Sequence, residues 1–188
     1  MSMIEENIEE KQDLELTKKA MESISPTYCA AKWLNSTIWL YCGETASCHH
    51  LSGHKVNLTD LMKNGCDKLH NTPQKIKERE EMLLGKKPRE CSYCWDIERH
   101  SGLVGDRLYK TAEFSTEDIE ETLINTTSIF PKYLEIAFDN ICNMACCYCS
   151  SKYSSRIASI KGDPKDYGKA KKLYMYFFLE MATRSIKE

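Results

Sequence analysis

Hydrophobic positions recur at helical spacing in several stretches of the chain, and residues that begin or end helices flank these stretches. Residues 72–84 are the clearest case, because Thr72 can cap the first turn and Pro73 suits the first helical position. Gly85 follows where the helix should end. The same reasoning predicts helices over residues 3–24, 57–64, 115–124 and 168–186.

Two stretches are instead rich in β-branched and aromatic residues, which favour strands. These are residues 36–42 and residues 133–138. After the first, Gly43-Glu44 can turn the chain, so residues 45–48 would return as a hairpin with Cys48 near its end. The pattern predicts an α+β protein that contains a small hairpin-and-helix unit, followed by a strand, a loop and a helix.

Composition places the chain among globular proteins, with 188 residues, 41% hydrophobic and 29% charged. The net charge of −2 gives no basic field for nucleic acid or a membrane surface, so we expect neither partner. No apolar run reaches the roughly 18–20 residues of a membrane span. The acidic N-terminus has no apolar signal core, so we expect a cytoplasmic protein.

The chain contains ten cysteines, which a reducing cytoplasm would keep as thiols. Metal or iron–sulfur ligation is then the usual explanation, and five disulfides in a secreted protein are the alternative. Six cysteines fall in residues 25–100, none in 101–130 and four in 131–188. We therefore expect a leader helix over 1–24, a first cysteine-rich domain over 25–100, a connector over 101–130 and a second unit over 131–188.

In the second unit, three cysteines follow the predicted strand at C-x3-C-x2-C spacing: Cys142, Cys146 and Cys149. Three thiolates from one short loop can hold three irons of a 4Fe–4S cluster and leave the fourth iron open to a small molecule. A zinc site is the alternative, in which Cys146 and Cys149 would combine with the C-x2-C pair of Cys91 and Cys94. The interval to that pair exceeds the usual spacing of about 15–20 residues.

The stretch Cys142-x3-Cys146-x-Tyr148-Cys149 resembles the C-x3-C-x-aromatic-C signature of the radical S-adenosylmethionine (SAM) superfamily. The resemblance implies the first strand, loop and helix of a partial (β/α) barrel, with Tyr148 at the cofactor-binding loop. It also implies reductive cleavage of SAM to a 5′-deoxyadenosyl radical, which abstracts hydrogen from a substrate that the sequence does not identify. The electron would come from a donor such as a flavodoxin or a ferredoxin.

In the first domain, Cys29, Gly43 and Cys48 resemble the C-x(9–15)-G-x4-C element of SPASM and twitch domains, which bind auxiliary 4Fe–4S clusters. The pair Cys91-x2-Cys94 would complete a four-cysteine site of the twitch type. In the usual enzymes this module follows the radical SAM core, whereas here it precedes it. A structural four-cysteine zinc module is the alternative.

A radical SAM barrel has further strands and a Gly-Gly-Glu segment, and neither has a counterpart after Cys149. We therefore assign no catalytic residue and expect another polypeptide to carry the rest of the barrel. The alternative is a non-catalytic metal-binding module with zinc or an electron-transfer cluster. The remaining cysteines, Cys42, Cys66 and Cys147, are expected to be buried thiols, and His49, His50 and His54 to be solvated loop residues.

Overall fold

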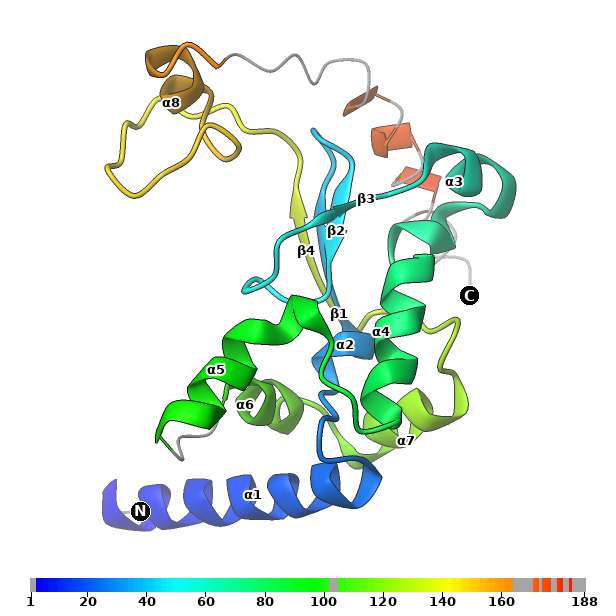
Figure 1. Ribbon diagram of the computed structural model, residues 1–188, viewed down its shortest axis with the longest axis vertical. Coiled ribbons are helices and arrows are strands. Elements are labelled where there is room, and N and C mark those ends of the chain that lie inside the picture. Colours follow the sequence, from blue (N-terminus) through cyan, green and yellow to red (C-terminus); the bar gives the residue numbers. More distant parts are fainter. Residues whose placement is uncertain are drawn as a thin grey trace. The chain divides into compact units, whose positions relative to one another are not determined.

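The computed structural model describes residues 3–101, 105–163, 171–172, 174–176, 179–180 and 183. It is a mixed α+β protein with one four-stranded sheet, as Figure 1 shows. Within these residues, no helix combines the length and the apolar character that a membrane crossing requires. The chain divides into two compact units: a first unit of 1–36, 46–52 and 70–134, and a second unit of 37–45, 53–69 and 135–188.

This division differs from the expected one, because each unit collects segments that are distant in sequence. The hairpin region is split, so residues 46–52 belong with the first unit while residues 37–45 group with residues 135–188. The expected connector, 101–130, also contains helices that pack into the first unit. Contacts between residues far apart in the sequence decide the grouping, and the distribution of cysteines along the chain does not reveal them.

Helices make up most of the first unit, and several of their ends match the predicted capping residues. Thr72 accepts a hydrogen bond from the Lys75 amide at the start of α4, and Gly85 follows its end at φ 71°. Ser115 and Asp118 form a reciprocal capping box at the start of α7. The helices are α1 (Met3–Ile24), α2 (Ala31–Leu34), α4 (Pro73–Leu83), η2 (Arg89–Cys91), α5 (Ser92–Ser101), α6 (Asp106–Ala112) and α7 (Thr116–Ile124).

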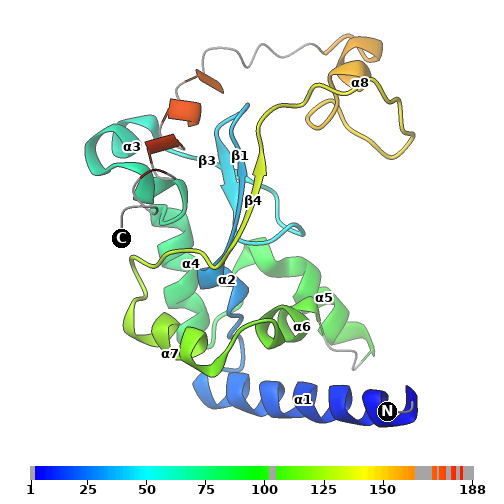
Figure 2. The same ribbon diagram turned by 180° about the vertical axis from the view of Figure 1, so that it is seen from behind.

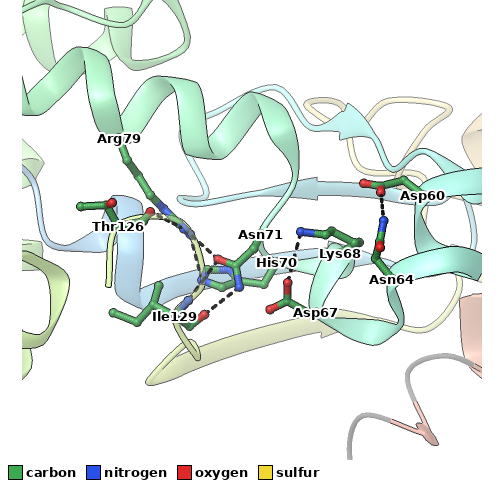
Figure 3. Close-up of polar contacts among 9 residues, drawn as sticks. All are labelled: Asp60, Asn64, Asp67, Lys68, His70, Asn71, Arg79, Thr126 and Ile129. Carbon is green, nitrogen blue, oxygen red and sulfur yellow. Dashed lines mark hydrogen bonds and ion pairs between the residues drawn. The ribbon is translucent and has the colours of Figure 1, made fainter. Parts of the chain in front are cut away.

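The short helix α2 lies at the centre of the first unit, in contact with α4, α6 and α7, while α1 packs along α6 (Figure 1). Trp33 and Leu34 of α2 join Met21, Met82 and Leu108 in the buried core. Arg79 is fully buried beside them and reaches from α4 to Asn71, His70 and the carbonyl of Thr126 (Figure 3). The core of this unit therefore combines apolar packing with a buried polar network.

The sheet has the strand order β3-β2-β1-β4, and Figure 2 shows β4 beside β1. Two backbone bonds, Lys132 N to Leu34 O and Leu40 N to Ala137 O, place these two neighbours parallel to each other. β2 and β3 pair antiparallel. The strands are β1 (Asn35–Trp39), β2 (Glu44–Ala46), β3 (His54–Lys55) and β4 (Tyr133–Ala137).

The second unit has its own apolar cluster, which includes Ile38, Leu40, Leu61 and Tyr174. Its helices are α3 (Leu58–Asn64), η1 (Cys66–Leu69) and α8 (Ser155–Ile160). Of the helix predicted over 168–186, the described residues are helical and the others lie outside the described part of the chain. Cys42 and Cys66 are buried as predicted, but the prediction for Cys147 is wrong. Cys147 is exposed in the loop between β4 and α8.

Candidate metal-binding sites

Four cysteines from distant parts of the sequence line one cavity of the first unit. Cys29 precedes α2, Cys48 follows β2, Cys91 ends η2, and Cys94 lies in the first turn of α5. None of them forms a disulfide. The complete lining is Cys29, Ala31, Cys48, His50, Leu51, Met82, Cys91, Tyr93, Cys94, Trp95, Asp106, Arg107 and Lys110.

Hydrogen bonds hold the segments of Cys29, Cys91 and Cys94 in place. The Ala30 amide donates to Thr111 Oγ1 at 3.1 Å, and Arg107 Nη1 donates to the Tyr28 carbonyl at 3.0 Å, so α6 fixes both sides of Cys29. The Cys91 amide and Trp95 Nε1 both donate to the Pro88 carbonyl at 3.1 Å. These ligand-bearing turns are therefore anchored independently of anything bound in the cavity.

Backbone amides point at three of the four sulfurs. The Ala31 amide hydrogen-bonds Cys29, the His50 amide hydrogen-bonds Cys48, and the Arg107 amide hydrogen-bonds Cys94. Such bonds stabilise a thiolate, because they place a partial positive charge beside the sulfur. For the fourth sulfur, that of Cys91, burial raises the pKa and the nearby positive charge of Lys32 partly opposes that rise.

Burial and the mutual repulsion of the thiols nevertheless raise the cysteine pKa values. Burial, with the thiols of Cys91, Cys48 and Cys94, raises the pKa of Cys29 to about 12. Burial chiefly raises the pKa of Cys94 to about 11. Four neighbouring thiolates therefore need a cation to balance them, and a metal centre deprotonates its thiols when it binds.

Lys32 is the buried cation nearest to this set. Its side chain is 1% exposed and forms an ion pair with Glu78. Burial lowers the pKa of Lys32, but the charges of Cys91 and Glu78 outweigh burial and raise it above the ordinary value. Beyond its ion pair with Glu78, the Lys32 ammonium has no hydrogen-bond partner among the described residues, so it retains donor capacity toward an acceptor beside it.

The four sulfurs are not grouped as closely as a tetrahedral zinc site requires. Zinc–sulfur bonds of about 2.3 Å place the sulfurs of a tetrahedral site about 3.8 Å apart. Among the described residues, no three cysteine sulfurs lie within 4.8 Å of one another. A cluster spreads its thiolates over separate irons, which suits a wider set.

The ligand atoms of three other residues do lie within 4.8 Å of one another: His49, His50 and Asp106. His50 and Asp106 also line the cysteine cavity, and His50 Nε2 contacts the Asp106 carboxylate. The His50 ring stacks on Tyr93 with its centroid 3.9 Å away. We expected these histidines to be solvated loop residues, and only contacts across the fold bring His50 to the cavity wall.

The second unit carries the other three predicted ligands in the loop between β4 and α8. Ser155 closes this loop, since the Cys142 amide donates to Ser155 Oγ at 3.1 Å and the Ser155 amide donates to the Asn140 carbonyl at 2.8 Å. Lys152 forms an ion pair with Glu44 of β2, and its ammonium lies over the Trp39 ring. The strand and the loop lie where they were predicted, and the helix that follows them, α8, was not predicted because the sequence of residues 150–163 is mostly polar.

Cys142, Cys146 and Cys149 are half-buried in this loop, in contrast to the exposed Cys147. The Cys149 amide donates to the Cys146 carbonyl at 3.0 Å, which forms a tight turn between these two ligands. Tyr148 is 89% exposed, and its hydrogen bond with Cys146 raises its pKa. The loop thus presents thiols at an open surface, whereas the first unit encloses them.

No family model, curated protein or solved structure matches this chain. The assignment of the two sites therefore depends on the chemistry and placement of their residues. Seven cysteines remain the predicted ligands, and four of them share one cavity.

Proposed function

We propose that the chain is an iron–sulfur protein of the radical SAM type. In this proposal the first unit holds an auxiliary 4Fe–4S cluster through Cys29, Cys48, Cys91 and Cys94. The observation that carries it is the convergence of these four distant cysteines on one cavity. The hydrogen bonds from backbone amides to three of the sulfurs add support, because they fit thiolate ligands better than structural thiols.

In the same proposal Cys142, Cys146 and Cys149 hold a second 4Fe–4S cluster whose open iron binds SAM. The support is the order of strand, three-cysteine loop and helix, with the loop closed by Ser155. Such a cluster, once reduced by a flavodoxin or ferredoxin, supplies the electron that cleaves SAM. The protein's own residues hold the ligands, and further barrel strands outside residues 131–188 would enclose the substrate.

Anaerobic reconstitution followed by iron, sulfide and zinc analysis tests both sites. We expect about eight irons and eight sulfides per chain, falling to about four of each in a C142A/C146A/C149A variant. Cys147→Ala, in the same loop but outside the predicted set, is the matched control and should change neither number. Stoichiometric zinc with little iron or sulfide would contradict the proposal.

The second candidate is a non-catalytic metal-binding module. The observation that favours this candidate is that the four cysteines of the cavity all lie within the first unit. A metal bound there would need no ligand from the three-cysteine loop. SAM distinguishes the two candidates. Together with the polypeptide that carries the rest of the barrel, a radical SAM protein should bind SAM and convert it to 5′-deoxyadenosine when reduced with dithionite, and a binding module should do neither.

A further inference from the structure

The first unit buries more positive than negative charge. Lys75, Glu78 and Arg79 occupy the buried face of α4 at helical spacing, and Lys32 of α2 lies beside them. Among the described residues, these four are the buried side chains of Lys, Arg, Asp or Glu. Three of them are basic and one is a carboxylate. A helix face toward a core normally carries apolar residues, so this arrangement requires an explanation.

Of these cations, Lys32 is the one whose ammonium has no hydrogen-bond partner among the described residues. Arg79 is satisfied by oxygens, including the Lys32 carbonyl at 3.1 Å and Asn71 Oδ1 at 2.7 Å. Burial and the nearby charges of Arg79 and Lys32 lower the pKa of Lys75 well below its usual value. Lys32 has one carboxylate partner, Glu78, and the thiols of Cys91 and Cys29 are the other acidic groups that act on it.

An anionic occupant of the cavity would supply the missing negative charge. Four thiolates around an oxidised 4Fe–4S core leave about two net negative charges, and one-electron reduction adds another. A fixed positive charge beside the ligands stabilises the reduced state more than the oxidised state, and therefore raises the reduction potential. Lys32 is close enough to act this way, because its backbone amide donates to the carbonyl of the Cys29 ligand at 3.0 Å and its charge also lowers the pKa of Cys91 against the larger effect of burial.

We propose that Lys32, held by Glu78, is the residue that sets the reduction potential of the cluster in the four-cysteine cavity. This inference rests on the proposed function, since it requires a cluster there. Lys32 acts through its positive charge. Glu78 both positions the ammonium and offsets part of its charge, so the two side chains should shift the potential in opposite directions.

The test uses potentiometric reduction monitored by electron paramagnetic resonance (EPR), in the C142A/C146A/C149A background so that only the cavity cluster reports. Lys32→Met should lower the potential, and Glu78→Gln should raise it. Lys77→Met, an exposed position on the same helix, should leave it unchanged. A purely structural role for Lys32 and Glu78 would not produce shifts of opposite sign.

The outcomes separate this inference from the proposed function. If the background variant takes up no iron and sulfide, the proposed function fails and this inference fails with it. If the cluster assembles and its potential is the same in all variants, only the inference is overturned. If Lys32→Met cannot assemble the cluster, Lys32→Arg decides: assembly with arginine supports a charge requirement, and failure with both overturns it.

Discussion

Gly105 lies directly against Cys94. A β-carbon at residue 105 would come within 2.8 Å of Glu98 Oε1, at the end of a flexible side chain, and within 3.2 Å of Cys94 Cβ and 3.3 Å of the Cys94 carbonyl oxygen. The backbone of Gly105 is extended, at φ −69°, so alanine would suit the conformation and only the contact opposes it. Absence of a side chain here lets the start of α6 approach the ligand-bearing turn of α5.

Gly105→Ala should therefore displace Cys94 and weaken the cavity site. We expect a clear drop in iron bound by the cavity and a loss of about 1–3 kcal/mol in the free energy of unfolding, because the added carbon overpacks the contact. Iron analysis and urea unfolding measure the two effects. Tyr109→Ala, on the exposed side of the same helix, is the control for a general effect on α6. Full iron content in Gly105→Ala would show that the turn adapts.

How much of this site the sequence could predict depends on how far apart along the chain the interacting residues lie. Capping at Thr72 and Ser115 was predictable because the interacting groups are three residues apart. The ligand set was predictable only as a resemblance to a known spacing. Glu78 and Lys32 gave no such signal, since a charged residue in a polar helix is normally exposed. Their burial results from α2 packing on α4, which no local pattern encodes.

His70 should make the first unit sensitive to mild acid. Burial, with the charges of Lys75 and Arg79, lowers the pKa of His70 well below its usual value, so the folded state holds it neutral. Below pH about 6.5 the unfolded chain gains a proton that the folded chain excludes. Stability should be at its full value above that pH and fall as pH decreases, by up to about 1.4 kcal/mol per pH unit.

Urea unfolding between pH 7.5 and about 5 measures this dependence. A His70→Gln variant can still donate to the Trp33 carbonyl, which lies 2.7 Å from His70 Nε2, and should have a flatter profile. His100→Gln, at an exposed position, should keep the wild-type slope. The interpretation is wrong if His70→Gln retains the full decline toward acid pH.

Gly43 combines two constraints in the second unit. Its φ of 66° is in the left-handed region, and a β-carbon there would lie 2.0 Å from the Tyr174 ring. Gly65 has a similar φ of 77° but nothing within 4 Å of the added carbon. Gly65→Ala should therefore cost about 1–2 kcal/mol from backbone strain, and Gly43→Ala distinctly more. Equal losses in urea unfolding would mean that the Tyr174 contact contributes nothing.

Ser155 should control the three-cysteine loop without affecting the cavity. Its hydroxyl accepts from the Cys142 amide at 3.1 Å and lies 3.4 Å from the Cys142 carbonyl, so it fixes the first ligand of the loop. Ser155→Ala leaves that amide without its partner, and we expect faster iron loss from the loop cluster under chelation. The cavity cluster lies in a different unit and should be retained.

The readout is the EPR signal of the reduced protein with and without SAM, because SAM perturbs only a cluster with an open iron. In Ser155→Ala the SAM-sensitive signal should decay several-fold faster with chelator, while the SAM-insensitive signal persists. Ser159→Ala, on the exposed side of α8, controls for effects on that helix. Equal decay of both signals would mean that Ser155 affects general stability and does not position Cys142.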